Sequence, residues 1–249
     1  MDIIASYKTD TGTFRKNNQD ALLFLKNKTG QVLAVVCDGL GGHSCGDIAS
    51  SMAVSLLKDF FNETKWIRLQ TDEQVHQWLN TSVLKIQSAM NQYSLNNEEA
   101  SDIGTTMVIT LITNRKAYLV NIGDSRIYLF NNQGLKQLTS DHNILNLYLK
   151  NNPKQAADID VNQTYWKALT SALGPIKNLT IDIFDLSFET PSYFLLTSDG
   201  VHDFLEEAEI THILEKNNSL KTKVKMLIKQ AINNVSTDNL SAILMLVKD

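Results

Sequence analysis

This chain has little of what marks a secreted, membrane-spanning or nucleic-acid-binding protein. It holds two cysteines, Cys37 and Cys45, which are too few for a disulfide framework and fit a reducing compartment. The N-terminus lacks the basic and apolar regions of a signal peptide, and no apolar run is long enough to cross a membrane. With 23 basic and 27 acidic residues, the formal net charge of −4 provides no basic surface for nucleic acid. We therefore expect a cytoplasmic protein without a membrane span and without a nucleic-acid partner.

Several catalytic motifs are also missing. There is no Gly-Lys-Ser/Thr phosphate loop, and Gly39-Leu40-Gly41-Gly42 follows an aspartate instead of opening a dinucleotide-binding turn. Neither cysteine is followed six residues later by the arginine of cysteine-dependent phosphatases, and the five histidines show no zinc-ligand pairing with the cysteines. Asp158-Ile159-Asp160-Val161 superficially resembles the nucleophile motif of haloacid-dehalogenase phosphatases but lacks the preceding apolar strand. The available metal ligands are thus mainly oxygen atoms.

Prolines number 3 and glycines 11, and no stretch has the composition of a linker. The 249 residues, 43% hydrophobic, can form one sizeable core, so we expect a single domain over residues 1–249, with two domains as the minor alternative. Apolar runs of period two, or continuous ones, predict strands at 3–7, 21–25, 32–37, 105–112, 116–122, 126–130, 181–188, 193–197 and 240–247. Helical spacing predicts helices at 46–60, 72–93, 206–215 and 219–233. Two groups of strands with helix pairs after each favour two packed sheets covered by helices.

Five aspartates lie at the ends of predicted strands. Asp38, Asp124 and Asp199 follow apolar runs, whereas Asp20 and Asp238 precede them. A single aspartate of this kind is ordinary turn chemistry. If the strands lie side by side, however, the five carboxylates converge and repel one another unless hard cations neutralise them. Oxygen donors of this type select Mg²⁺ or Mn²⁺.

Two further features bear on such a site. Arg15 precedes Asp20 by five positions and forms either a solvated surface pair or a guanidinium fork for phosphate. Residues 141–170 break the strand pattern beside the predicted strand ends and are expected to form a flap that contacts protein substrates. The alternative for this segment is a structural cap packed over the sheet.

Eight short motifs follow one another along nearly the whole chain. They are Thr11-Gly12 with Arg15-Lys16-Asn17-Asn18-Gln19-Asp20-Ala21, then Asp38-Gly39-Leu40-Gly41-Gly42-His43, Gly104-Thr105-Thr106, Gly123-Asp124-Ser125-Arg126, Asp141-His142, Ala172-Leu173-Gly174, Ser198-Asp199-Gly200 and Thr237-Asp238-Asn239. In order and content this succession resembles the metal-dependent serine/threonine phosphatases of the PP2C (PPM) type in their compact bacterial form. The resemblance implies an α+β fold, a four-layer αββα sandwich of two mainly antiparallel β-sheets flanked by helices, with the metal site at one end of the sheets. A parallel, doubly wound α/β fold is the alternative.

The resemblance also implies a metal-binding role for six residues. Asp38 would bridge two metal ions, and the carbonyl group of Gly39 would bind one of them. Asp199 and Asp238 match the ligands of the other ion. In addition, Asp20 matches a carboxylate held to the pair through water, and Asp124 resembles a ligand of a third, weaker ion.

Three other positions carry over from the family. Arg15 would bind the phosphate independently of the metal ions. His43 would be the general acid that protonates the leaving oxygen, the alternative being a loop residue bonded to backbone. Gln19 departs from the pattern, since the family often has glutamate there, and one negative charge beside the metals is missing.

The function implied is a protein serine/threonine phosphatase that hydrolyses phosphoserine and phosphothreonine by direct attack of a metal-bridging hydroxide, with Mn²⁺ or Mg²⁺ as cofactor. Its partners would be phosphorylated proteins, the targets of a serine/threonine kinase, and we expect a monomer. Two alternatives differ in class or target. One is a pseudophosphatase or phosphoprotein-binding module that uses the same groove, and the other is a phosphatase tuned to anti-sigma-factor antagonists. The presence of every matched aspartate favours an active enzyme.

Overall fold

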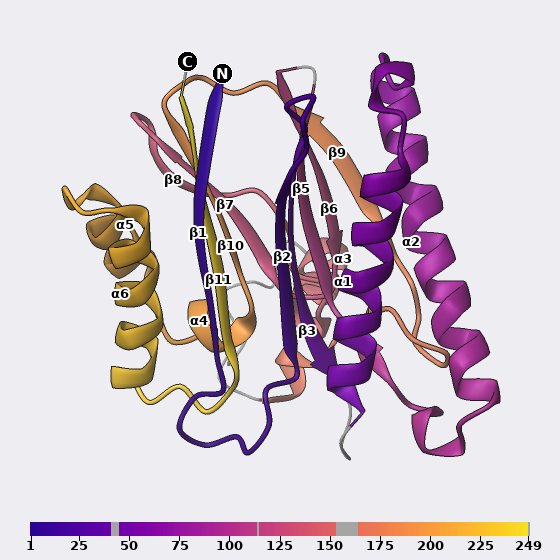
Figure 1. The fold of residues 1–249 in the computed structure, drawn as a ribbon. Coiled ribbons are helices and arrows are strands. Elements are labelled where there is room, and N and C mark those ends of the chain that lie inside the picture. The colour runs from indigo at the N-terminus through magenta and orange to yellow at the C-terminus, as the bar shows by residue number, and fades with distance from the viewer. Residues whose placement is uncertain (41–44, 114, 153–163, 249) are drawn as a thin grey trace.

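The computed structural model describes residues 1–40, 45–113, 115–152 and 164–248. Two β-sheets lie face to face, with one pair of helices outside each sheet (Figure 1). All paired strands in the described part of the chain are antiparallel. The αββα sandwich predicted from the sequence is thereby confirmed, and the parallel doubly wound alternative is wrong.

The first sheet has the strand order β1-β11-β10-β7-β8, and the second has the order β2-β3-β5-β6-β9, with β4 paired to β3. The strands are β1 Asp2–Asp10, β2 Asp20–Lys26, β3 Val32–Leu40, β4 Gly104–Thr105, β5 Met107–Thr113, β6 Lys116–Ile122, β7 Arg126–Asn131, β8 Gly134–Gln137, β9 Asp182–Leu186, β10 Ser192–Thr197 and β11 Leu240–Lys248. Strands that begin or end at the predicted aspartates are therefore distributed over both sheets.

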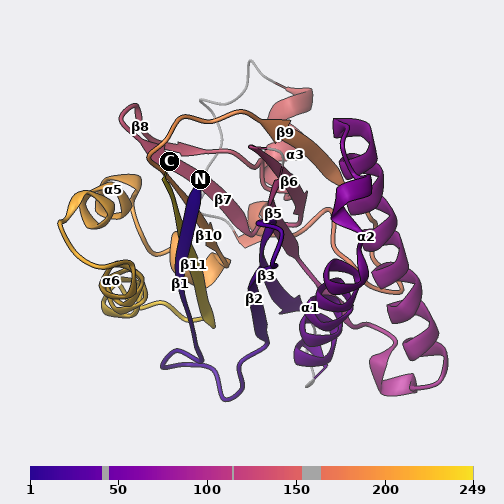
Figure 2. The same ribbon diagram turned by 45° about the horizontal axis from the view of Figure 1, so that its top comes forward.

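Helix pairs close the two outer faces (Figure 2). They are α1 Gly46–Glu63 and α2 Asp72–Leu95 on the second sheet, and α5 Glu207–Glu215 and α6 Leu220–Asn233 on the first. Helix α3 Ile144–Asn151 follows β8, and the short helix α4 Asp199–His202 packs against β10, β11 and α6, with Val201 in the core between the first sheet and its helices. In α1 the buried side chains recur at helical spacing, which gives the helix one apolar face toward the sheet. No helix in the described residues is both long and apolar enough to cross a membrane.

The continuous apolar run of β3 is explained by burial on both faces. Leu33, Val35 and Cys37 face the core between the sheet and α1 and α2. Val32, Ala34 and Val36 face the core between the two sheets. Because successive side chains of a strand point to opposite faces, a strand buried on both sides needs no polar residue until it leaves the core. That point is Asp38.

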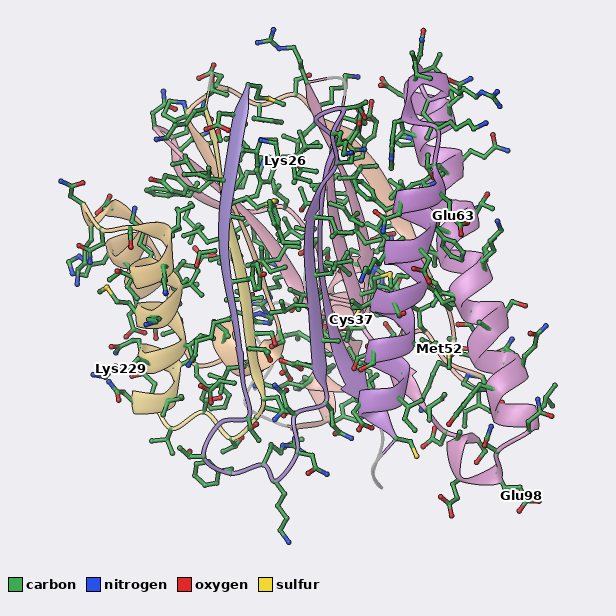
Figure 3. All side chains as sticks on the ribbon, in the orientation of Figure 1. Lys26, Cys37, Met52, Glu63, Glu98 and Lys229 are labelled. Carbon is green, nitrogen blue, oxygen red and sulfur yellow. The ribbon has the colours of Figure 1, made fainter. Side chains whose placement is uncertain are left out.

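Figure 3 shows the direction of the β2–β3 hairpin, with Lys26 at its upper end and Cys37 farther down, next to Asp38 in the sequence. Asp38 therefore lies toward the lower end of the sheet in this view.

Most predicted elements agree with the observed ones to within a few residues. The structure adds β4, β8, α3 and α4, which were not predicted. On α2, the side chain of His76 is half-buried, and its Nε2 atom lies 3.0 Å from Oδ1 of Asp185.

Candidate metal and phosphate site

The five aspartates converge at one end of the sandwich, as the strand pattern predicts. Asp20 and Asp38 lie directly opposite each other on β2 and β3. Asp199 begins α4 directly after β10, Asp238 lies two residues before β11, and Asp124 lies between β6 and β7. A cleft of about 250 Å³ opens here. Its walls are formed by Arg15, Gln19, Asp38, Gly39, Leu40, Asp124, Lys167, Leu169, Asp199 and Asp238.

Asp38 is held at the cleft by threonines of the neighbouring segment. Its backbone N–H donates to Oγ1 of Thr106 at 2.9 Å, and its carbonyl accepts the N–H of Thr106 at 2.9 Å. The hydroxyl of Thr105 donates to the same carbonyl at 2.8 Å. Both threonines are fully buried. The backbone that carries the Asp38 carboxylate is therefore fixed before any ligand binds.

Gly39 allows three backbone segments to meet beneath the cleft. Its N–H donates to the carbonyl of Gln19 at 3.1 Å. A Cβ atom at this position would lie 2.2 Å from the carbonyl oxygen of Gly46 and 2.5 Å from that of Gln19. Since only glycine tolerates such an approach, the Asp-Gly sequence is required for the start of α1 to pack against β3.

Asp20 lies behind the cleft with one unsatisfied carboxylate oxygen. The hydroxyl of Ser198 donates to its Oδ2 at 2.8 Å, whereas Oδ1 is buried and has no hydrogen-bond partner among the described residues. Burial, together with the charges of Asp199 and Asp238, raises the pKa of Asp20 to about 7. A nearby cation would therefore stabilise the ionised form of Asp20.

The pKa values of Asp38, Asp124 and Asp199 are raised as well. Burial and then the charges of Asp20, Asp199 and Asp124 raise the pKa of Asp38 well above its usual range. Burial and the charge of Asp238 raise the pKa of Asp199 to about 6. The pKa of Asp124 is also well above its usual range, because of burial and then the charge of Asp199. The cleft concentrates negative charge that its own cations do not neutralise.

These residues fit divalent metal ions. The donors are carboxylate and carbonyl oxygens, which hard cations prefer, and Oδ1 of Asp199, like Oδ1 of Asp20, is buried without a hydrogen-bond partner in the described structure. Among the described residues, no group of three or more His, Cys, Asp or Glu side chains is already arranged to hold a metal ion. Asp20 instead accepts a hydrogen bond from Ser198, and Asp238 accepts one from Arg15. An ion bound by Asp238 would therefore have to displace the guanidinium group.

Arg15 reaches the cleft from the loop between β1 and β2. Its Nη2 donates to Oδ2 of Asp238 at 2.7 Å, and its Nε donates to the carbonyl of Thr237 at 3.3 Å. Asn239 fixes this loop to the start of β11, since its Nδ2 donates to the carbonyls of Thr11 and Asn17. The structure thus pairs Arg15 with Asp238, one of the predicted metal ligands. A cation bound by Asp238 would compete with the guanidinium group for this carboxylate.

The segment 141–170 does border the cleft. Lys167 and Leu169 line it, and Nζ of Lys167 lies 2.8 Å from Oδ2 of Asp203, the residue that ends α4. The sequence alone did not identify Lys167, Ser198 or Thr106 as individual contributors, although the last two lie within the quoted motifs. The predicted general acid His43 and the Asp158-Ile159-Asp160-Val161 motif lie outside the described residues.

Comparison with known proteins identifies the family of this chain. A family model described as Protein phosphatase 2C matches residues 14–245. Serine/threonine phosphatase stp of Listeria monocytogenes serotype 4b is 33% identical over 240 residues, which cover 96% of this chain and 94% of the relative. Protein phosphatase PhpP of Streptococcus pneumoniae serotype 2 is 31% identical over 241 residues, with 96% and 95% covered. The crystal structure of serine/threonine phosphatase Stp1 from Staphylococcus aureus is 30% identical, with a TM-score of 0.90, and the match covers 100% of this chain and 96% of that chain.

Proposed function

The chain belongs to the protein phosphatase 2C family and is a protein serine/threonine phosphatase, and from this premise we propose that the aspartate-lined cleft is its metal-dependent active site. The observation that carries the proposal is one cleft lined by four aspartates and one arginine, with a fifth aspartate, Asp20, behind it and with buried carboxylate oxygens that lack hydrogen-bond partners. Clustered carboxylates of this kind are destabilising unless a cation or a proton compensates them. A cation is the compensation that also serves phosphate hydrolysis.

We assign the metal-binding roles as follows. Asp38 would hold both of two ions, Mn²⁺ or Mg²⁺, and the carbonyl of Gly39 would bind one of them. Asp199 and Asp238 would bind the other ion, and Asp20 would act through a water molecule. Asp124 would bind a third, weaker ion. When bound, such ions neutralise the phosphate and lower the pKa of the water that attacks phosphorus.

The remaining steps belong to the chain itself. Arg15 binds the phosphate with its planar, permanently charged fork, for which it turns away from Asp238. His43 protonates the departing serine or threonine oxygen, a contribution of roughly 10²–10⁴-fold for a general acid. Gln19 lies in the cleft wall and leaves the metal site with one fewer negative charge than a glutamate would.

The proposed partners are proteins phosphorylated by a serine/threonine kinase. We further propose that the protein acts as a monomer in the cytoplasm. The two cysteines of the chain are free, with Cys37 buried, which agrees with a reducing compartment.

The test compares turnover with binding. We expect hydrolysis of p-nitrophenyl phosphate and of a phosphothreonine peptide in Mn²⁺ or Mg²⁺, and loss of both activities in EDTA. Asp38→Asn should reduce turnover to background while the circular dichroism spectrum stays that of the wild type, because the Asp38 backbone is held by Thr105 and Thr106. Full activity of rigorously metal-free protein would refute the proposal. Metal-dependent binding of the phosphopeptide without turnover would establish the binding-module alternative.

A further inference from the structure

His142 lies between the turn that carries Asp124 and the base of the flap, and none of the roles assigned above uses it. Its side chain is 11% exposed. Its backbone N–H donates to the carbonyl of Gly123 at 2.9 Å, and its Nδ1 accepts the N–H of Gly123 at 3.3 Å. One residue thus bonds both backbone polar groups of the glycine that precedes Asp124.

Asp182 determines which tautomer of the His142 imidazole is present. Because Nδ1 accepts a hydrogen bond, the ring proton of the neutral imidazole lies on Nε2. That atom is 2.9 Å from Oδ2 of Asp182, the first residue of β9. A carboxylate that fixes the tautomer of a histidine in this way also fixes the orientation of its ring. Asp182 and His142 therefore act as one unit on Gly123.

On its other side, the Gly123 turn packs against the residue that holds Asp38. Gly123 has a φ of +95°, and a Cβ atom there would lie 2.6 Å from Cγ2 of Thr106. Thr106 accepts the backbone N–H of Asp38 through Oγ1. The turn is thus confined between His142 and Thr106, so a displacement of the turn would change the position of Asp124 relative to Asp38.

His142 is also the point at which the flap joins the cleft. The N–H of Thr170 donates to the carbonyl of His142 at 2.8 Å, and Asn143 forms an antiparallel β-bridge with Leu169. Leu169 lines the catalytic cleft. The same residue therefore positions one cleft wall and the turn opposite it.

We propose that His142, oriented by Asp182, is a positioning residue that sets the Gly123–Asp124 turn and the flap base relative to Asp38. The inference rests on the proposed function, because it acts through the carboxylate assigned to the third ion. Loss of the imidazole leaves the N–H of Gly123 without its side-chain partner, while the backbone bond to the Gly123 carbonyl remains, and this loosens the turn. The affinity of the weaker Mn²⁺ site and kcat then fall together, while KM for p-nitrophenyl phosphate, which depends on Arg15, is unchanged.

The test uses two substitutions and a matched control. His142→Leu removes both side-chain bonds, whereas His142→Asn places an oxygen close to the position of Nδ1 and keeps the bond to Gly123. Mn²⁺ binding is followed by electron paramagnetic resonance of the free ion, and kcat and KM are measured with p-nitrophenyl phosphate. We expect His142→Leu to weaken the weaker site and to lower kcat by about 10-fold, and His142→Asn to restore both to within about threefold of the wild type.

His76 provides the control, because its Nε2 atom lies 3.0 Å from Asp185 on the same strand as Asp182 but away from the cleft. His76→Leu should leave Mn²⁺ binding and kcat at wild-type values. Equal losses in His76→Leu and His142→Leu would overturn the proposal, as would wild-type Mn²⁺ binding and kcat in folded His142→Leu.

Asp182→Ala keeps the proposal testable if His142→Leu does not fold, since the Asp182 side chain is 47% exposed. We expect it to weaken Mn²⁺ binding and kcat in the same sense, and wild-type values would overturn the proposal. If the wild type itself hydrolyses no phosphate ester, the proposed function fails, whereas the Mn²⁺ titration of these variants still tests the role of His142.

Discussion

At the scale of single residues, the site contains several negative charges, and no single neighbouring residue neutralises them all. Asp20 and Asp38 face each other across two strands, an arrangement of like charges that is unfavourable in a sheet. Asp238 is compensated by Arg15, and Asp20 by the hydroxyl of Ser198. A cation and a phosphate would replace these internal partners. Metal binding and phosphate binding are therefore linked through the pair Arg15–Asp238.

The first prediction concerns that pair. Arg15→Ala should raise KM for p-nitrophenyl phosphate and lower kcat/KM by about 10-fold or more, because a charge-assisted phosphate contact is lost. The same change should shift the Mn²⁺ titration to lower concentration, since Asp238 no longer has a competing guanidinium group 2.7 Å away.

Arg68→Ala offers a control, because Arg68 lies in the short helix that follows α1 and does not line the cleft. It should change neither quantity. A Mn²⁺ midpoint that stays fixed or moves to higher concentration in Arg15→Ala would show that the pair does not compete with the metal.

At the scale of elements, the sequence predicts the helices and strands that have a periodic apolar pattern, and it does not predict the short elements whose position depends on packing. The long helices α1, α2 and α6 and the buried strands have clear apolar patterns, so their residues could be identified directly. Helix α4 has four residues, too few for any period, yet it carries Asp199. The strand-end aspartates could be predicted because each follows or precedes an apolar run.

The contacts between elements could not be predicted in the same way. Arg15 and Asp238 are 223 positions apart, and His142 and Asp182 are 40 apart. Such contacts follow from which strands pair and in which register, and neither is encoded in a local pattern. Lys167 is a similar case, because nothing in its own segment indicates that it faces Asp203 and the cleft.

The second prediction concerns the flap. Lys167 lies in the cleft wall on the segment expected to contact protein substrates, with its side chain 62% exposed. Lys167→Ala should lower kcat/KM on a phosphoprotein by several-fold, about 1 kcal/mol for an exposed charge contact, and leave p-nitrophenyl phosphate hydrolysis nearly unchanged.

Lys58→Ala is the control, since Lys58 is an exposed lysine of α1, lies outside residues 141–170 and does not line the cleft. It should affect neither substrate. If Lys167→Ala instead lowers both activities in parallel and also lowers the melting temperature, the segment is a structural cap and the flap interpretation is wrong.

At the scale of the whole molecule, the site exists only when both sheets are packed together. Asp20 and Asp38 lie on strands of the second sheet, Asp199 and Asp238 lie next to strands of the first, and Asp124 lies in the turn from β6 of the second sheet to β7 of the first. Folding therefore brings together carboxylates that are far apart and solvated in the unfolded chain. Bringing these charges together lowers the free energy of unfolding of the whole protein, by an amount that should depend on pH and on metal ions.

The third prediction follows from the direction of the pKa shifts. The pKa of Asp20 rises from 3.8 to about 7 on folding, and that of Asp199 rises to about 6. A carboxyl whose pKa is raised binds its proton more tightly in the folded state. Its contribution to the free energy of unfolding is therefore fully present below about pH 3.8 and is lost as the pH rises through the folded-state pKa. In EDTA the melting temperature should therefore fall between about pH 5 and pH 8. Each kcal/mol lost corresponds to roughly 2–4 °C in a chain of this size.

Metal ions should reverse this trend, because they bind the ionised carboxylates and compete with protons. The increase in melting temperature caused by Mn²⁺ should thus be larger at pH 8 than at pH 5.5. Asp38→Asn removes one of the coupled carboxyls and should flatten the pH dependence in EDTA, whereas Asp59→Asn, on the exposed face of α1, should leave it as in the wild type. Differential scanning calorimetry in EDTA and in Mn²⁺ measures both effects. A metal-free protein whose melting temperature rises or stays constant over this range would show that the carboxylates do not bear the folding cost assigned to them.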